Sequence, residues 1–169
     1  LPALFAVLLL LQPQQASVKF RRVGSVLAML LNLLVATALL WQQTNVPASH
    51  YLLGNWPEPF GILLVADQLS SLFVWLTTLL TLAVVVYSCA GDDEKGAYFH
   101  PLLHFLLMGL NGAFLTGDLF NLFVFFEVLL IASYGLLVHG GGKKRIHSAL
   151  HYVVLNLVGS ALFLLALAL

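Results

Sequence analysis

The stretch from Asp118 to Tyr134 decides the fold, and its sequence is Asp-Leu-Phe-Asn-Leu-Phe-Val-Phe-Phe-Glu-Val-Leu-Leu-Ile-Ala-Ser-Tyr. Glu127 is the single charged residue of the apolar run that extends from residue 119 to residue 138. A run of about 20 residues is what one helix needs to cross the hydrocarbon of a bilayer. A charged side chain at the centre of such a helix costs about 2.5–3.5 kcal/mol on insertion scales, and packing does not require it. We therefore interpret Glu127 as a proton or cation site inside a transmembrane helix.

The composition of the whole chain agrees with a membrane protein. Of the 169 residues, 61% are hydrophobic and 8% are charged, whereas soluble domains carry about 25% charged residues. The sequence therefore predicts an integral membrane protein that contacts the lipid bilayer. Seven basic and seven acidic residues cancel, which gives no electrostatic basis for binding nucleic acid. The one cysteine, Cys89, excludes an internal disulfide and a cysteine metal cluster.

Six apolar segments predict an all-α, polytopic transmembrane helix bundle that forms one transmembrane domain over residues 1–169. The connection 42–59 is long enough for a small hairpin. The first segment lacks the basic region and the cleavage site of a signal peptide, so we expect a truncated helix there. The last segment stops without a polar tail, and we expect the sequence to be an N-terminal fragment of a larger protein, truncated at both ends. The predicted helices cover residues 1–11, 23–41, 68–90, 102–116, 119–138 and 148–169.

The basic residues predict the orientation in the membrane. Six of the seven Lys and Arg lie in the loops 12–22 and 140–147, and the alternate connections around residues 42–59 and 117–118 hold none. The positive-inside rule places the basic loops in the cytoplasm. Because the crossings alternate, the N-terminal end is then outside.

Four further polar residues lie on or beside the predicted helices. Tyr134 is two turns from Glu127 on the same face, where it would either hydrogen-bond the carboxylate or anchor the helix at the interface. His151, one turn into the last segment, would either relay protons or act as an amphipathic anchor. Asp67 and Asp118 directly precede apolar segments, and we expect both to cap helix N-termini.

The spacing of the histidines and glycines predicts neither a metal site nor a cofactor. The six histidines do not form H-E-x-x-H or another ligand pattern. His104, in the fourth segment, is a weaker candidate for proton transfer than His151. The glycine-rich loop at residues 140–144 lacks the spacing of a phosphate-binding loop and follows a predicted helix, not a strand.

The sequence from His100 to Glu127 resembles the D-type subunit of the Mrp-type multisubunit cation/proton antiporters. The resemblance continues through Ser133-Tyr134, the three glycines at 140–142 and the stretch 151–160, and it includes residues 54–57 and 61–67. The wider family contains the proton-pumping subunits of respiratory complex I and of membrane-bound hydrogenases.

The resemblance implies more than the composition does. The full subunit would have about fourteen helices, built on inverted repeats, and would work with other subunits in a hetero-oligomeric complex of a bacterial or archaeal plasma membrane. The essential glutamate of the fifth helix falls on Glu127, and a sixth-helix position that is often lysine falls on His151. The lysine that pairs with the glutamate lies on a seventh helix, beyond residue 169.

Three functions are compatible with these residues. The first is a subunit of a secondary transporter, not an enzyme, that exchanges protons for a monovalent cation such as sodium, with Glu127 as the proton carrier. The alternative is a proton-translocating membrane subunit of an NADH–quinone oxidoreductase or a membrane-bound hydrogenase. The same carboxylate would serve both, but the Phe-Phe-Glu and Gly-Gly-Gly-Lys-Lys signatures favour the first. A structural scaffold would leave the carboxylate at mid-membrane depth unexplained.

Overall fold

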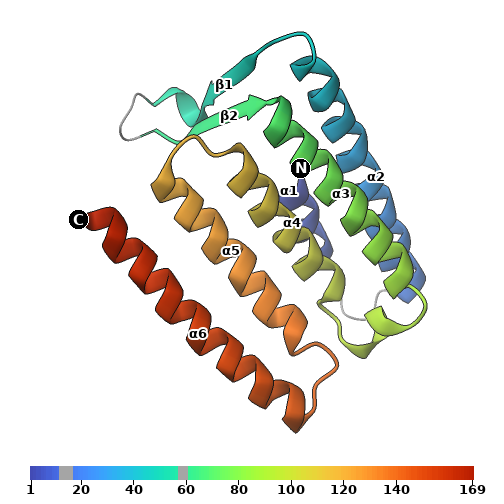
Figure 1. Cartoon of the computed structure of the whole chain (residues 1–169). Helices are drawn as coiled ribbons and strands as arrows, with labels where there is room; N and C mark the ends of the chain where they lie inside the picture. Colours follow the sequence, from blue (N-terminus) through green and yellow to red (C-terminus); the bar gives the residue numbers. More distant parts are fainter. Residues whose placement is uncertain (12–16, 57–60) are drawn as a thin grey trace.

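A computed structural model describes residues 1–11, 17–56 and 61–169. In these residues the chain forms a bundle of six α-helices with a two-stranded sheet at one end (Figure 1). The predicted all-α membrane bundle is thereby confirmed. The helices are α1 (Pro2–Leu10), α2 (Val18–Gln43), α3 (Gln68–Ser88), α4 (Phe99–Leu115), α5 (Leu119–Leu137) and α6 (Lys143–Ala168).

The largest differences from the hydropathy pattern are the starts of two helices. α2 starts at Val18 and α6 at Lys143, each five residues before the predicted boundary. The basic residues that were assigned to loops belong to the first turns of these helices. Their long side chains reach polar surroundings from a helix end, so the hydropathy boundary lies inside the helix.

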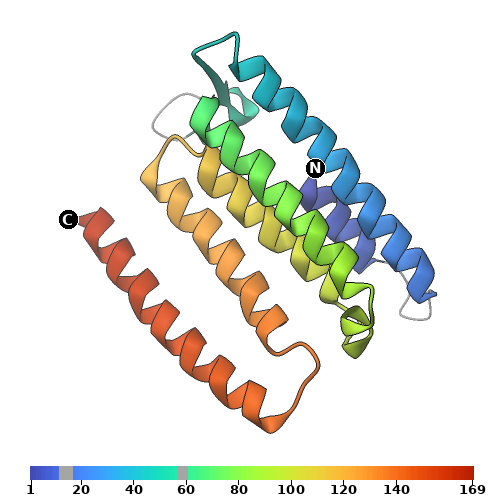
Figure 2. The ribbon, with the colours of Figure 1, turned by 45° about the vertical axis from the view of Figure 1, so that its right-hand side comes forward.

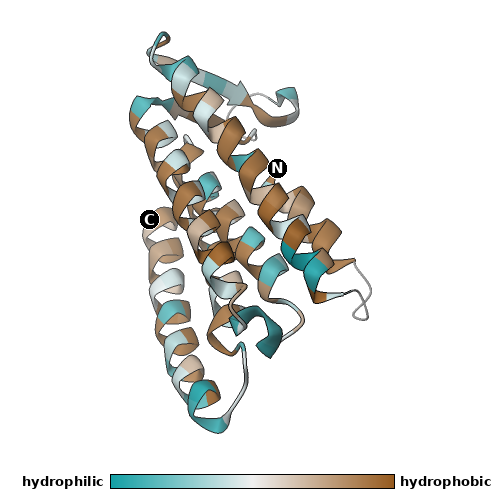
Figure 3. Cartoon of the chain, turned by 90° about the vertical axis from the view of Figure 1, so that its right-hand side faces the viewer, coloured by the Kyte–Doolittle hydropathy of each residue, from teal (hydrophilic) through white to brown (hydrophobic). Residues whose placement is uncertain are grey.

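The helices have the length and apolarity of membrane spans. In the described part of the chain, α2, α3, α5 and α6 are long and apolar enough to cross a membrane, and α4 is a shorter apolar helix of 17 residues. Hydrophobic residues cover most of each helix, while hydrophilic residues gather toward the two ends of the bundle (Figure 3). The chain is therefore a multi-pass membrane protein.

The interior of the bundle is built around α4, which packs against α1, α3 and α5. Glycines let α4 and α5 approach closely. A Cβ at Gly109 would lie 2.7 Å from the backbone nitrogen of Leu129, and one at Gly112 would overlap the ring of Phe125. Small residues at such interfaces are typical of packed membrane helices. In contrast, α6 lies at the edge of the bundle beside α5 (Figures 1 and 2).

One end of the bundle carries a hairpin whose first strand lies in the connection 42–59, as expected, and whose second strand lies beyond it. Strand β1 (Ala48–Leu52) pairs antiparallel with β2 (Leu63–Asp67), and residues 57–60 lie outside the described residues. Asp67 accepts a hydrogen bond from the backbone of Ser70 as the N-cap of α3. Asp118 accepts one from the backbone of Asn121 as the N-cap of α5. Both capping predictions are confirmed.

The opposite end of the bundle, called here the basic end, gathers all seven Lys and Arg of the sequence. Three stand at the start of α2 and three at the start of α6, while Lys95 belongs to the short 3₁₀ helix η2 (Asp92–Lys95). The connection after α5 contacts η2 at this end, where the ring Nε2 of His139 lies 2.8 Å from the carbonyl oxygen of Asp92. The basic connections therefore share one end, as the alternating crossings predicted.

Candidate functional site

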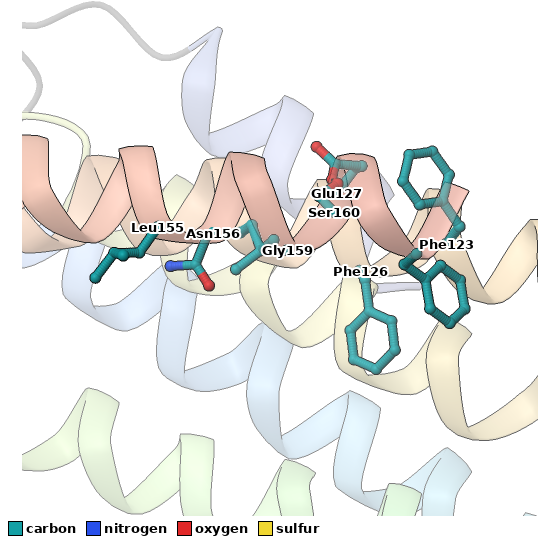
Figure 4. A pocket seen from close by; sticks show the side chains of 9 residues that line it. Phe123, Phe126, Glu127, Leu155, Asn156, Gly159 and Ser160 are labelled. Atoms are coloured by element: carbon teal, nitrogen blue, oxygen red, sulfur yellow. The ribbon is translucent and has the colours of Figure 1, made fainter. Parts of the chain in front are cut away.

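Glu127 lies half-buried on α5 and faces α6. Its carboxylate accepts a hydrogen bond from the hydroxyl of Ser160, which is 33 residues away in the sequence. The two side chains meet between the helices, deep in the spanning segments (Figure 4). The carboxylate is therefore turned toward a polar group of the neighbouring helix.

A cavity of about 230 Å³ opens beside this carboxylate. Its only polar side chains, among the residues described, are those of Glu127, Ser160 and Asn156. The amide nitrogen Nδ2 of Asn156 donates to the carbonyl oxygen of Tyr152 at 2.8 Å, so Oδ1 remains as the acceptor of that side chain. The cavity is lined by Phe123, Phe126, Glu127, Leu130, Leu155, Asn156, Gly159, Ser160 and Phe163 (Figure 4).

The glycine-rich loop between α5 and α6 positions this site. Gly140, Gly141 and Gly142 have φ angles of +81°, +67° and +102°. Residues with a Cβ rarely adopt positive φ angles. Three such residues in succession let the chain reverse and bring α6 back along α5. Aromatic packing then supports the wall, since the rings of Phe123 and Phe163 stack with centroids 6.3 Å apart.

Tyr134 lies toward the basic end from Glu127. Seven residues along a helix correspond to about 10.5 Å, and the hydrogen bond that Glu127 accepts comes from Ser160. The Tyr134 hydroxyl is buried and has no hydrogen-bond partner within the described ranges. Its ring meets that of Tyr152 edge-on, with centroids 5.7 Å apart. A role for Tyr134 beside Glu127 stays a prediction.

His151 is exposed on α6 and lies nearer to the basic end. Nine residues separate it from Ser160, which is about 13.5 Å along the helix. Its Nδ1 donates to the carbonyl oxygen of His147 at 2.9 Å, and its ring lies edge-on to that of His147 at 4.6 Å. The structure does not bring His151 to the cavity, and its proton-relay role stays a prediction.

A polar stripe of α6 connects these residues. Ser160, Asn156 and Tyr152 follow one another at four-residue spacing and therefore share one face of the helix. Tyr134 of α5 contacts this stripe at Tyr152. The stripe runs from the cavity toward the basic end. His151, which precedes Tyr152 in the sequence, lies about 100° around the helix from this face.

A second polar site, at the basic end, was not predicted from the sequence. The guanidinium of Arg22 donates to both carboxylate oxygens of Asp93 at 2.7 Å and to Glu94 at 2.8 Å. His100 lies with its Nε2 3.2 Å from Asp93. Hydrogen bonding to Arg22 lowers the pKa of Asp93 below its usual value of 3.8. These four residues, called here the Arg22–Asp93 cluster, join α2, η2 and α4.

His104 is fully buried beside this cluster. Its Nε2 lies 3.3 Å from the hydroxyl of Ser25 on α2, and its ring lies near that of Phe5 on α1. The side chain therefore faces α1 and α2, while Glu127 faces α6. In the described residues, no three His, Cys, Asp or Glu side chains are arranged to hold a metal ion.

Known proteins are similar to this chain, including the part that forms the cavity. Residues 116–169 match the family described as NADH:quinone oxidoreductase/Mrp antiporter, TM. The chain is 57% identical over 126 residues to the D-type subunit of a probable K(+)/H(+) antiporter of Rhizobium meliloti, covering 74% of this chain and 23% of that protein. It is 40% identical over 167 residues to the D-type subunit of the Na(+)/H(+) antiporter of Bacillus subtilis, covering 98% of this chain and 34% of that protein. The resemblance to the family of D-type antiporter subunits is confirmed.

Solved structures show the same fold. The Mrp complex from Dietzia sp. contains a chain that superposes with a TM-score of 0.83 at 29% identity, covering 99% of this chain and 33% of that one. The membrane-bound sulfane sulfur reductase, an archaeal respiratory complex, gives a TM-score of 0.86 at 26% identity, covering 97% and 33%. The chain thus spans about a third of the matched chain in each of these structures and 23–34% of the two antiporter relatives.

Proposed function

We propose that this chain is part of a membrane subunit of a multisubunit monovalent cation/proton antiporter, and that Glu127 carries the proton. The observation behind the proposal is the position of the carboxylate, which lies inside a spanning helix and against a cavity between α5 and α6. The two antiporter relatives are named for K⁺/H⁺ and Na⁺/H⁺ antiport. We propose sodium as the cation, with potassium as the other choice to be tested.

The charge distribution supports a proton-carrying role. All seven Lys and Arg lie in the segments of the basic end, so none is level with Glu127. An ionised carboxylate without a counter-charge is costly in an apolar environment. Glu127 therefore gains from binding either a proton or a cation. The Ser160 hydroxyl suits both protonation states because it can donate a hydrogen bond or accept one.

The polar stripe of α6 offers a path for the proton between the cavity and the basic end. We propose that Tyr134 and His151 serve as relays between the cavity and the basic end, with Tyr152 beside Tyr134 and Asn156 at the cavity. Imidazole and phenol groups can both donate and accept protons. Gaps between these groups would be crossed by water.

The basic end supports the proposed orientation. With the seven Lys and Arg at one end of the bundle, the positive-inside rule favours the cytoplasm for that end. The hairpin end and the N-terminal end would then face outside, in the plasma membrane of a bacterium or an archaeon. The other subunits of a hetero-oligomeric complex would be its partners.

A second candidate is a proton-translocating subunit of a redox-driven complex. The matching family includes NADH:quinone oxidoreductase, and the sulfane sulfur reductase is a respiratory complex. The two candidates differ in what drives the proton: an antiporter responds to addition of sodium or potassium, whereas a redox pump responds to an electron donor.

The test of the proposed function is Glu127→Gln in the full-length subunit within its complex. Glutamine keeps the size and the hydrogen bonding of the side chain but cannot ionise, so assembly should be retained. Proton flux in everted vesicles on addition of sodium or potassium should be lost. Glu127→Asp, which keeps a carboxyl group, should retain partial flux. Wild-type flux in the glutamine variant would contradict the proposal.

A further inference from the structure

The cavity beside Glu127 contains oxygen atoms suited to a monovalent cation. Its polar lining consists of the Glu127 carboxylate, the Ser160 hydroxyl and the Asn156 amide. Cations in membrane proteins are bound by oxygen atoms that replace their hydration shell. We propose that Glu127, Ser160 and Asn156 together bind the transported cation, in competition with the proton. This inference rests on the proposed function and adds the cation ligands to it.

The hydrogen bonds of the site leave oxygen lone pairs available. Asn156 donates through Nδ2 to the carbonyl of Tyr152 at 2.8 Å, which fixes the amide and leaves Oδ1 as a ligand. Ser160 uses its proton in the bond to Glu127, and a hydroxyl oxygen retains acceptor capacity when it donates. Ser160 and Asn156 are one turn apart on α6, so both oxygens reach the same side of the helix.

The charge of the site favours a monovalent cation. Of the described residues that line the cavity, Glu127 alone is acidic. A monovalent ion on this carboxylate gives a neutral pair, whereas a divalent ion leaves an uncompensated positive charge in apolar surroundings. Aromatic faces attract cations, and the wall contains Phe123, Phe126 and Phe163.

The size of the cavity allows partial hydration. Its volume of about 230 Å³ is many times the roughly 10–15 Å³ of accessible space that one water molecule needs. A cation held by three protein oxygens can therefore keep some of its water. Partial hydration agrees with transport, since a transported ion must also leave the site.

Competition at one carboxylate would couple the two ions. When Glu127 is protonated, it has no net charge and can donate its proton to the oxygen of Ser160. When the proton leaves, the carboxylate and the lone pairs of Ser160 and Asn156 are free for the cation. Each ion thus displaces the other at the same oxygen atoms, and antiport follows if the site opens to both sides of the membrane in turn.

The experiment measures cation dependence in everted vesicles that contain the complete complex. Removing one oxygen ligand by Ser160→Ala or by Asn156→Ala should raise the half-saturating sodium or potassium concentration about tenfold or more. The quantity that decides is the half-saturating cation concentration, because the loss of a cation ligand changes it and a lower amount of assembled complex does not. Ser160→Thr, which keeps the hydroxyl, should restore the wild-type cation dependence.

Ser133→Ala is the matched control. Ser133 lies on α5, donates to the carbonyl of Leu130 at 2.7 Å and does not line the cavity; its loss should leave the half-saturating concentration unchanged. Unchanged cation dependence in both Ser160→Ala and Asn156→Ala, with Glu127→Gln inactive, would contradict the cation site and leave the proposed function standing. Transport by Glu127→Gln would instead contradict the proposed function itself.

Discussion

The Arg22–Asp93 cluster and the Glu127 cavity are both polar sites of a largely apolar protein, but they are held in different ways. In the cluster, the Asp93 side chain is 1% exposed and is bonded by Arg22 and His100, which fix α2 and α4 to the η2 turn. Glu127 has a single hydrogen bond within the described residues, from Ser160, and lies beside an open cavity.

The helices that carry the two sites also differ in how much of their surface is buried. Of the apolar window of α2, 28% is buried inside the bundle, whereas none of the corresponding window of α6 is buried. A carboxylate with two partners in a packed interior has its charge state fixed. A carboxylate with one neutral partner and free volume can change its charge without breaking the fold. This difference supports a structural role for Asp93 and the proposed proton-carrying role for Glu127.

The largest effect on stability is expected for Asp93→Ala. The substitution removes the main partner of Arg22 and should lower the stability of the assembled protein by about 2–3 kcal/mol. This is less than the 3–5 kcal/mol typical of a fully buried pair, because Arg22 is partly exposed and keeps Glu94. The thermal midpoint of the purified complex measures the loss. Complexes that do assemble should still transport ions. Wild-type thermal stability in Asp93→Ala would contradict the structural role of Asp93.

The pH dependence of thermal stability provides a control for this prediction. Because the folded state lowers the pKa of Asp93, the stabilisation is fully present above the unfolded pKa and is lost as pH falls through the folded value. The difference in thermal midpoint between wild type and Asp93→Asn should therefore be constant from pH 9 to about pH 5. A difference that disappears within that range would show that Asp93 is not held ionised.

A matched pair of glycine substitutions should show that the α4–α5 interface is packed more tightly than the α5–α6 interface. A Cβ at Gly112 would overlap the ring of Phe125, whereas one at Gly159 would meet nothing within 4 Å. Gly112→Ala should cost about 1–3 kcal/mol by overpacking. Gly159→Ala should change the stability by no more than about 0.5 kcal/mol. Equal losses of thermal stability would show that α5 and α6 pack as tightly as α4 and α5.

The smallest effect on stability is expected for Tyr134→Phe. The hydroxyl of Tyr134 has no hydrogen-bond partner in the described part of the chain, so its removal should leave the thermal midpoint within the experimental error. If Tyr134 relays protons, the rate of proton flux should fall while the half-saturating cation concentration stays the same. Tyr152→Phe is the control at the adjacent ring. Unchanged proton flux in Tyr134→Phe would contradict a relay role for Tyr134.

The features that the sequence predicted are those that depend on local pattern. Hydropathy located the six helices, and helix spacing with a preceding carboxylate identified Asp67 and Asp118 as caps. The early starts of α2 and α6 were missed because a hydropathy pattern counts basic residues as loop, although their side chains reach out from a helix end.

The contacts that define the two polar sites could not be predicted in this way. Arg22 and Asp93 are 71 residues apart, and Glu127 and Ser160 are 33 residues apart. Their meeting depends on how the helices pack, which in turn depends on glycines such as Gly112 and on the loop at residues 140–142. A single sequence shows that each residue is polar in an apolar segment, but not which other residue it faces.

The most direct test of the central claim is infrared difference spectroscopy of the complete complex, which reports the protonation of a single carboxyl group. At a pH where the proton is bound, addition of sodium or potassium should remove a protonated carboxylic acid band and produce a carboxylate band. The change should be absent in Glu127→Gln and present in Glu94→Gln. A cation-induced carboxyl signal that persists in Glu127→Gln would contradict the account, because the proton would then be carried by another residue.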